Sequence, residues 1–332
     1  MPSLIKDLSH PAALPDPTSA VHVVQTHISI VFVGDDYVYK VKKPVDFGFL
    51  DFTTLEKRRH FCERELKLNR RLSKQVYLDV LPVRFKENRF SMTDTSGDIV
   101  EYAVRMKRIP DERLMKSVFD RKEITREHLY GIASVLSKFH STAARSSEID
   151  DFGQPEMFRV NTDENFEQVK KYVGLTVEKE AFAALRMWTD DFYDTNRALF
   201  LQRIREGRIR DCHGDLHMEH ICIMEGYPII DCIEFNNRFR YSDTLADIAF
   251  LVMDLEYWGD AEAAGIFWKS YKDMAGEGNV EHLLTFYKVY RAFVRGKVIG
   301  FQVDDDRIGK REKDEAVRRA ARYFRLAASY IR

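Results

Sequence analysis

The chain has 332 residues, of which 45% are hydrophobic and 32% are charged. At roughly 150 residues per domain, this length predicts about two domains, each with enough apolar material for a core. The 52 basic and 53 acidic residues give a formal net charge of −1. This balance excludes a polyanion-binding protein, so no nucleic-acid partner is expected.

Membrane insertion and secretion are not expected either. The longest uninterrupted apolar run covers only residues 248–253, whereas a helix that spans a membrane needs about 20 residues. The N-terminus shows no charged start followed by an apolar core, and four cysteines are too few for a disulfide framework. We therefore expect a cytoplasmic protein, and the sequence does not indicate its oligomeric state.

The first part of the chain predicts a small, mostly antiparallel sheet that carries one helix. Proline-rich residues 1–19 predict an irregular or partly ordered lead-in. Residues 55–72 have the spacing of an amphipathic helix with Phe61, Leu68 and Leu72 on one face. β-Branched and aromatic residues between turn signals predict strands at residues 21–25, 28–33, 37–42, 80–85 and 99–106.

The second part of the chain predicts mainly helices. Helical spacing covers residues 124–142, residues 163–206 with a break near Gly174, and residues 260–300, which hold at least two helices. Residues 307–331 predict a basic amphipathic helix. Such a helix could lie on a membrane, but it more commonly packs on its own domain.

One short hairpin, with strands predicted at residues 221–224 and 229–233, interrupts this helical part. We place the domain boundary at residues 106–110, where strand patterns give way to helical ones. The chain then divides into a lead-in (1–19), a first lobe (20–106) and a helical second lobe (107–332).

The densest group of reactive side chains lies in residues 212–232, which hold three of the four cysteines and three histidines. A polar loop with the sequence His-Gly-Asp-Leu-His (213–217) enters the predicted hairpin, and an aspartate ends its second strand. Asp215, His220 and Asp231 are therefore expected within reach of one another. Two carboxylates and a polar group can hold a divalent cation and accept a proton, as phosphoryl transfer from a nucleotide requires.

The same segment permits a zinc site as an alternative. His213 and His217 are separated by three residues, which fits one half of a structural zinc site. The cysteines are separated by nine intervening residues each, which fits no common zinc ribbon or finger. Cys222 and Cys232, on predicted strands, and His140, at the end of an apolar helix, are more simply explained as core residues.

Residues 213–217, followed by Ile-Asp at residues 230–231, resemble the catalytic loop and the metal-binding aspartate of the aminoglycoside phosphotransferase-like kinases. The resemblance implies an α+β chain with the bilobal protein-kinase-like fold. A small antiparallel-sheet lobe with one helix would bind the nucleotide, and a larger, mainly helical lobe would carry the catalytic loop and the substrate site. The implied activity is ATP-dependent transfer of the γ-phosphoryl group to a hydroxyl of a small molecule.

Finer details resemble a less studied bacterial branch of this family, some of whose members carry a C-terminal P-loop ATPase domain. The runs that carry this resemblance are residues 39–44, 49–52, 69–72 and 253–255, and Asp243 and Asp247 resemble the family's Asp-Leu-Ala segment. The chain has no Gly-x-x-x-x-Gly-Lys-Ser/Thr motif, so we expect no P-loop domain in it.

The resemblance assigns the catalytic groups. Asp215 would be the base that accepts or aims the proton of the acceptor hydroxyl. Asp231 and His220 would hold the metal, Mg²⁺ or Mn²⁺. Lys40 would contact the phosphates of ATP, and Glu65 would orient Lys40.

The remaining nucleotide contacts follow from the same resemblance. No Gly-rich loop is visible between the first two predicted strands, so Thr26 and Ser29 would cover the phosphates with hydroxyl and backbone N–H groups. Met106 and Lys107 would begin the hinge under the adenine. His213 would brace the catalytic loop rather than take part in the reaction.

Two of these assignments have competitors in the sequence. Lys42 has the same parity as Lys40 on the predicted strand, so either lysine can face the phosphates. Glu63 competes with Glu65, because a solvated helix face explains either residue equally well. His217 receives no definite role.

His220 raises a second functional hypothesis. The resembled family usually has asparagine at this position, and a neutral imidazole binds Mg²⁺ poorly and favours Zn²⁺ or Mn²⁺. The alternative to a kinase is therefore a nucleotide-binding regulatory module with weak or no phosphoryl transfer.

The acceptor is not identified by the sequence. A cationic acceptor would be expected to meet acidic side chains of the helical lobe, and the candidates are Asp254, Glu256, Asp260 and Glu262. Basic side chains are equally available for an anionic acceptor, and these are Arg238, Arg240 and Arg291.

Overall fold

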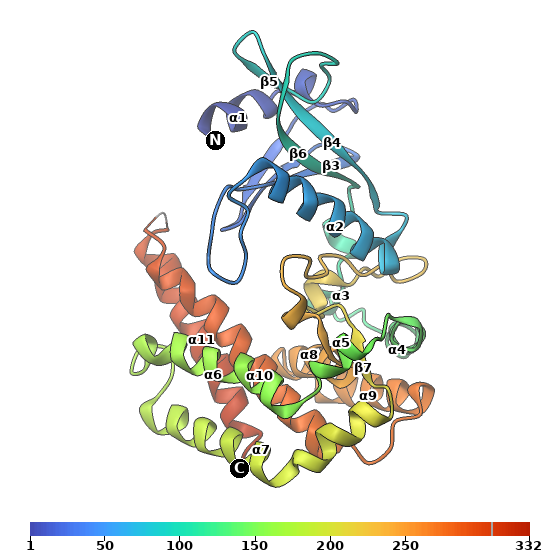
Figure 1. Ribbon diagram of the computed structural model, residues 1–332, viewed down its shortest axis with the longest axis vertical. Coiled ribbons are helices and arrows are strands. Elements are labelled where there is room, and N and C mark those ends of the chain that lie inside the picture. Colours follow the sequence, from blue (N-terminus) through green and yellow to red (C-terminus); the bar gives the residue numbers. More distant parts are fainter. Residues whose placement is uncertain (307) are drawn as a thin grey trace. The chain divides into compact units, whose positions relative to one another are not determined.

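The computed structural model describes residues 1–306 and 308–332, and the chain divides into two compact units. The first unit comprises Met1–Glu123 and Glu219–Asn237, and the second comprises Ile124–Met218 and Arg238–Arg332. The secondary structure is that of an α+β chain, with the sheet in the first unit and most helices in the second (Figure 1).

The first unit takes in a segment that the sequence placed in the helical lobe. The backbone N–H of Met115 donates to the carbonyl of Ile221 (2.8 Å), and the N–H of Ile223 donates to the carbonyl of Arg113 (2.7 Å). These bonds join Glu219–Asn237 to residues that follow the sheet, although the segment is distant from them in sequence.

A six-stranded, entirely antiparallel sheet frames the first unit, with the spatial order β1-β2-β3-β6-β4-β5. The strands are β1 (His22–Gln25), β2 (Ser29–Val33), β3 (Tyr37–Lys42), β4 (Tyr77–Lys86), β5 (Arg89–Ser91) and β6 (Asp98–Lys107). All five predicted strands are present. The short β5 was not predicted, although Glu87 and Asn88 both have positive φ (49° and 62°), the conformation that a tight hairpin turn requires.

The predicted helix of the first unit is α2 (Leu55–Ser73), which packs against β4 and β6 and is capped by the Thr54 hydroxyl. Its buried face is partly polar, so hydrophobic spacing described it incompletely. Phe61 and Leu72 are only partly buried, and the buried residues are Arg58, Cys62, Glu65, Leu68, Asn69 and Ser73. Arg58 is satisfied there by an ion pair with Glu101, with 2.7 Å between Nε and Oε2.

Residues 1–19, expected to be irregular or partly ordered, are partly helical. They contain α1 (Pro2–Leu8) and a 3₁₀ turn at Pro11–Ala13. Leu4 and Leu8, one helical turn apart, pack into the core of the sheet with Ile30 and Phe32. The sequence does not indicate this helix, because seven residues offer too few repeats to establish a period.

The second unit is built from helices. They are α4 (Arg126–Thr142), α5 (Ser147–Asp151), α6 (Pro155–Val169), α7 (Lys179–Arg205), α8 (Thr244–Tyr257), α9 (Ala261–Ala275), α10 (Glu281–Gly300) and α11 (Lys310–Ser329). A two-stranded ribbon of β7 (Ile209–Asp211) and β8 (Tyr241–Asp243) precedes α8. The predicted helices are confirmed, including the break near Gly174 that separates α6 from α7. The helix α8 was not predicted, because almost every residue in it is buried and no amphipathic period results.

The hairpin predicted at residues 221–233 is reduced to one bridge between Ile221 and Ile229. Hydrogen bonds from Cys222 N–H to the Pro228 carbonyl and from Ile230 N–H to the His220 carbonyl (both 2.9 Å) close it. The short loop places His220 and Asp231 at its open end, as expected.

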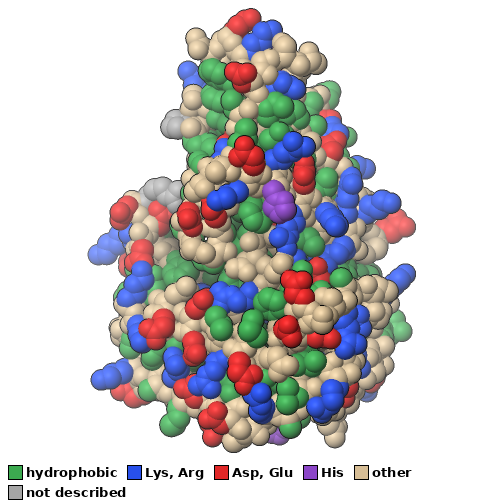
Figure 2. Space-filling view, in the orientation of Figure 1, with side chains coloured by type: hydrophobic (Ala, Val, Ile, Leu, Met, Phe, Trp, Pro, Cys, Tyr) green, Lys and Arg blue, Asp and Glu red, His purple; other side chains and the backbone are tan. Residues whose placement is uncertain are grey.

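The C-terminal helix α11 packs on its own unit, as the commoner alternative predicted; Arg307, where the sequence expected it to begin, lies outside the described residues. Its buried side chains are Ala316, Ala320, Tyr323, Phe324 and Ala327, which join the core formed by α8 and α10. No helix among residues 1–306 and 308–332 is long and apolar enough to cross a membrane. On the face shown in Figure 2, basic and acidic side chains are interspersed.

Candidate active site

Strand β3 and helix α2 bring two lysines to one glutamate in the first unit. Lys40 and Lys42 alternate with buried Tyr39 and Val41 on β3, so both amines emerge from the same face of the sheet. Lys40 Nζ lies 3.0 Å from Glu65 Oε1, and Lys42 Nζ lies 2.7 Å from Glu65 Oε2. Glu65 is therefore the partner of both lysines. Its competitor Glu63 pairs with Arg59 on the exposed side of α2.

Asp231 completes this group. Its Oδ1 lies 2.7 Å from Lys40 Nζ, and its Oδ2 lies 3.6 Å from His220 Nε2. Its backbone has a positive φ of 62°, which aspartate and asparagine adopt more readily than other side chains. The Tyr77 hydroxyl accepts the Asp231 N–H (3.2 Å), and Asn69 Oδ1 accepts the N–H of the next residue (2.9 Å). The loop that carries Asp231 is thus fixed to β4 and α2.

Glu234 is the member of the group that the sequence analysis missed. It is 4% exposed and forms an ion pair with Lys42, which is 1% exposed. The Glu234 carboxylate ties the segment after Asp231 to the same strand that carries Lys40. A glutamate three residues after the predicted metal ligand was the available signal, but an isolated carboxylate in a loop gives no indication of burial.

The opposite charges in this group keep one another ionised. Burial alone would lower the pKa of Lys40, but the Asp231 and Glu65 carboxylates raise it well above its usual value. Burial would raise the pKa of Glu65, but Lys40 and Lys42 lower it. Both lysines therefore stay cationic and Glu65 stays anionic at neutral pH, so that Lys40 keeps a charged amine that can bind an anionic ligand.

Asp215 lies in the second unit, on a loop whose backbone is hydrogen-bonded to the Asp247 carboxylate. Asp247 Oδ2 accepts the N–H of His213 (2.7 Å) and Oδ1 accepts the N–H of Gly214 (2.8 Å). The Asp215 side chain remains one-third exposed (34%), so its carboxylate is accessible while its backbone is anchored. Arg291 of α10 donates to the Gly214 carbonyl (2.8 Å) and fixes the loop from a second side.

His140, predicted to be a core histidine, supports this anchor. Its Nε2 lies 3.3 Å from Asp247 Oδ2, and its Nδ1 lies 2.8 Å from the hydroxyl of Tyr271. Burial would raise the pKa of Asp247, but the hydrogen bond and charge of His140 lower it to about 2. His213 also behaves as a brace, since its Nδ1 accepts the Asp215 N–H (3.3 Å). His217 lies beside Asp215, with 3.5 Å between Nε2 and Oδ2.

The predicted nucleotide contacts outside the ion-pair group differ in accessibility. Ser29 is fully buried, and the described residues offer its Oγ no hydrogen-bond partner, whereas Thr26 is exposed at the turn before β2. Met106 packs beside Tyr77 and Val104 at the end of β6. Lys107 is exposed, and its backbone N–H is already bound to the carbonyl of Val76 (2.8 Å).

The zinc alternative gains little from the geometry. His140, Cys212 and Asp247 have potential ligand atoms within 4.8 Å of one another. However, both Asp247 oxygens already accept backbone N–H groups, and burial raises the pKa of the Cys212 thiol well above its usual value. A zinc site requires a thiolate, which this environment disfavours. Cys222 and Cys232 are buried, as expected of core cysteines.

All four acidic candidates for a cationic acceptor have structural partners. Asp260 accepts the N–H of Ala263 (2.8 Å) at the start of α9, and Glu262 forms an exposed ion pair with Arg126 (3.2 Å). Asp254 is 2% exposed and accepts the N–H of Met218 (3.0 Å). Glu256 pairs with Lys288 (2.7 Å) and accepts the hydroxyl of Tyr330.

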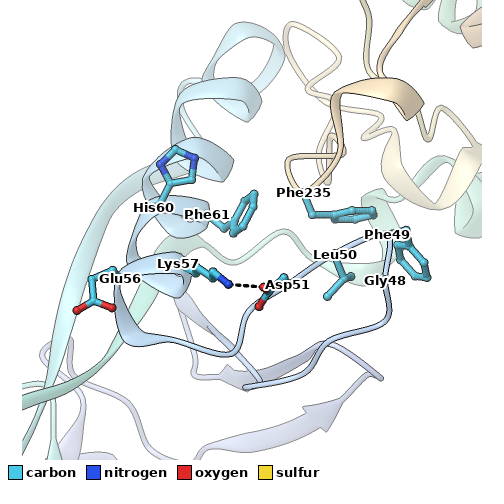
Figure 3. Close-up of a pocket in the computed structure, with 9 residues that line it drawn as sticks. All are labelled: Gly48, Phe49, Leu50, Asp51, Glu56, Lys57, His60, Phe61 and Phe235. Carbon is cyan, nitrogen blue, oxygen red and sulfur yellow. Dashed lines mark hydrogen bonds and ion pairs between the residues drawn. The ribbon is translucent and has the colours of Figure 1, made fainter.

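The first unit also has an open pocket of about 530 Å³, whose lining combines three phenylalanines with charged side chains (Figure 3). Phe49, Phe61 and Phe235 line it, and its ion pair between Lys57 and Asp51 is exposed. The pocket therefore differs in chemistry from the buried ion pairs around Glu65.

Fold and side-chain arrangement together define a protein-kinase-like chain. It matches the family described as the phosphotransferase enzyme family over residues 45–283, and it belongs to that family. An uncharacterised protein of Mycobacterium tuberculosis is 32% identical over 312 residues, which are 94% of this chain and 60% of that relative. An uncharacterised protein of Mycobacterium bovis matches equally. The chain thus spans about 60% of the length of these curated relatives.

Solved structures share the fold at low sequence identity. A choline/ethanolamine kinase family protein from Mesorhizobium loti has a TM-score of 0.54 at 14% identity, covering 99% of this chain and 98% of its own. The microcompartment-associated aminopropanol kinase also has a TM-score of 0.54, at 13% identity and with 96% and 94% covered. These likenesses confirm the kinase-like fold class.

Proposed function

We propose that the chain is an ATP-dependent phosphotransferase that moves the γ-phosphoryl group to a hydroxyl of a small molecule. The observation that carries the proposal is the ion-pair group of Lys40, Glu65 and Asp231, in which a cationic amine and a carboxylate lie 2.7 Å apart. Membership of a phosphotransferase family supports the same conclusion. Lys40 would bind phosphate oxygens, and Glu65 would keep its amine charged and aimed.

A divalent cation suits the donor set of Asp231 and His220. The Asp231 side chain is 44% exposed and supplies a hard oxygen, while the His220 imidazole nitrogen 3.6 Å away favours Mn²⁺ over Mg²⁺. A bound cation would supply positive charge against the phosphates. Lys40, which pairs with Asp231, contributes positive charge of its own to the same region.

Asp215 would act on the acceptor. Its accessible carboxylate would accept a hydrogen bond from the acceptor hydroxyl, aim the oxygen at the γ-phosphorus and take up the proton as the new P–O bond forms. Asp247 and Arg291 hold the backbone on either side of Gly214, so the carboxylate is positioned before the acceptor arrives. Positioning of this kind supplies much of the rate in phosphoryl transfer.

The experiment is thermal unfolding of the full chain with ATP, with and without Mg²⁺ or Mn²⁺, together with ADP release in the presence of pooled hydroxylated metabolites. An enzyme should be stabilised by the metal complex of ATP and should release ADP. A regulatory module, the alternative that His220 suggests, should be stabilised without turnover. Lys40→Met should lose the stabilisation, and Lys57→Met, at an exposed ion pair of the same unit, should keep it. ATP binding that is indifferent to Lys40 would contradict the proposal.

A further inference from the structure

A cluster of polar side chains lies between α6 and α10 in the second unit, where the two helices pack against each other. This α6–α10 cluster consists of Asn161, Glu164, Asn165, Gln168, Arg238, Tyr290 and Lys297. The four residues of α6 are spaced so that they share one helix face, and Tyr290 and Lys297 share a face of α10.

Lys297 is the unusual member of the α6–α10 cluster. Its Nζ donates to Asn165 Oδ1 (2.6 Å) and to Gln168 Oε1 (2.9 Å), which are neutral acceptors. The residues that the structure describes offer this amine no carboxylate within 4.0 Å, because Glu164 is bound to Arg238 (2.6 Å between Nη2 and Oε2). Burial therefore lowers the pKa of Lys297 to about 8. The charge of Glu164 raises this pKa, and the charge of Arg238 lowers it further.

Asn161 provides an independent observation. Its side chain is 4% exposed, and its Oδ1 has no hydrogen-bond partner among residues 1–306 and 308–332. A buried acceptor without a partner costs about 1–3 kcal/mol. Because Asn161 shares its helix face with Asn165 and Gln168, this oxygen is available to a hydroxyl or N–H group of a ligand bound by the same face. The cluster is open to solvent at Glu164, whose side chain is 45% exposed.

The α6–α10 cluster is close to the catalytic loop along α10. Arg291, the neighbour of Tyr290, donates to the carbonyl of Gly214, which directly precedes Asp215. Since a helix rises about 1.5 Å per residue, Lys297 lies about 9 Å farther along the axis than Arg291. A molecule of metabolite size can span such a distance.

We propose that the acceptor is a hydroxylated metabolite with a carboxylate or phosphate group, and that this anionic group binds between Lys297 and Arg238. The proposal rests on the phosphotransferase function proposed above and names its substrate class. An anion would supply the negative charge that Lys297 lacks within the protein. A hydroxyl of the same molecule would satisfy Asn161, which leaves another hydroxyl for Asp215.

The first test does not depend on activity. The lysines of the full chain are labelled with acetic anhydride near pH 8 and read by mass spectrometry, with phosphate, acetate or chloride at constant ionic strength. An anion bound beside Lys297 should raise its pKa, and a rise of one unit should slow its labelling at pH 8 about fivefold. Lys288 is the internal reference, because it lies on the same helix as Lys297 and pairs with Glu256 of α8. Protection by phosphate alone or by acetate alone identifies the anionic group, and equal labelling in all three salts overturns the proposal.

The second test uses the acceptor screen with ADP release as the readout. Acidic hydroxylated metabolites should be phosphorylated, and Lys297→Gln should raise their KM at least tenfold with a smaller change in kcat, because a hydrogen bond to a charged group is lost. Lys288→Gln is the matched control on α10. Turnover restricted to cationic acceptors, or a KM that Lys297→Gln leaves unchanged, overturns the proposal. If no metabolite is phosphorylated, the phosphotransferase function fails, and the labelling experiment still decides whether the α6–α10 cluster binds anions.

Discussion

Glu65 forms an ion pair with each of two lysines of one strand: Oε1 lies 3.0 Å from Lys40 Nζ, and Oε2 lies 2.7 Å from Lys42 Nζ. The Lys40 side chain is 15% exposed, whereas the Lys42 side chain is fully buried. The two lysines therefore differ in what they can do. Lys40 can reach a ligand, and Lys42 neutralises the buried carboxylates of Glu65 and Glu234.

Lys42→Met should destabilise the first unit by about 3–5 kcal/mol, because it leaves the buried Glu234 carboxylate without its cation. The free energy of unfolding in urea measures this loss. The double variant Lys42→Met/Glu234→Leu should recover most of it, since it replaces the ion pair with apolar side chains. A single variant as stable as the parent chain would show that Lys42 does not have this role.

Lys40→Met should have the opposite profile. It should lower the rate of ADP release about 100-fold or more, because it removes the positive charge that would stabilise the negative charge developing on the phosphates. Stability should change by only about 1 kcal/mol, since Glu65 keeps Lys42 and Asp231 is 44% exposed. Both quantities are measured on the same preparation as Lys42→Met. If Lys42→Met loses turnover and Lys40→Met does not, the assignment of the two lysines is reversed.

Asp247 predicts a specific acid sensitivity. Its pKa is about 2 in the folded chain against 3.8 for an unperturbed aspartate, so the folded state favours the carboxylate. This contribution is fully present above about pH 4 and is lost as pH falls toward 2. The difference corresponds to about 2 kcal/mol.

Urea unfolding of Asp247→Asn across this pH range tests the prediction. The variant should be less stable than the parent chain at neutral pH, and the gap should narrow by about 2 kcal/mol between pH 4 and pH 2. Asp194→Asn, at an exposed position of α7, should show a small and constant difference. A gap for Asp247→Asn that stays constant over this range would argue against the anchoring role.

His220→Asn should change the metal preference. Replacement of the imidazole by an amide oxygen favours Mg²⁺ over Mn²⁺, so turnover with Mg²⁺ should rise severalfold and the ratio of Mn²⁺ to Mg²⁺ rates should fall. ADP release is measured over a titration of each metal. An unchanged ratio of the Mn²⁺ and Mg²⁺ rates would show that His220 does not bind the metal. Of the two residues, only Asp231 would then remain as a metal ligand.

Much of the fold was predictable because its elements repeat with clear periods. The strand at residues 37–42 coincides with β3, and the helix at residues 55–72 coincides with α2 to within one residue. Elements without a period were missed. Examples are α1, which is too short, and α8, which is buried on all sides.

The candidate site was predictable in its parts but not in its contacts. The sequence indicated Lys40, Glu65 and Asp231, and it could not choose between Lys40 and Lys42 because both have the same parity on β3. The choice depends on Glu234, which buries Lys42 and lies 192 residues away in sequence. Long-range pairs of this kind leave no local pattern.

The most direct test of the central claim is ADP release by Asp215→Asn at saturating ATP with an identified acceptor. The asparagine keeps the shape of the side chain but cannot take up the hydroxyl proton, so the rate should fall by about 10²–10⁴. Stabilisation of the chain by ATP should be unchanged, because Lys40, Glu65 and Asp231 are intact. A variant that releases ADP at the rate of the parent chain would contradict the account.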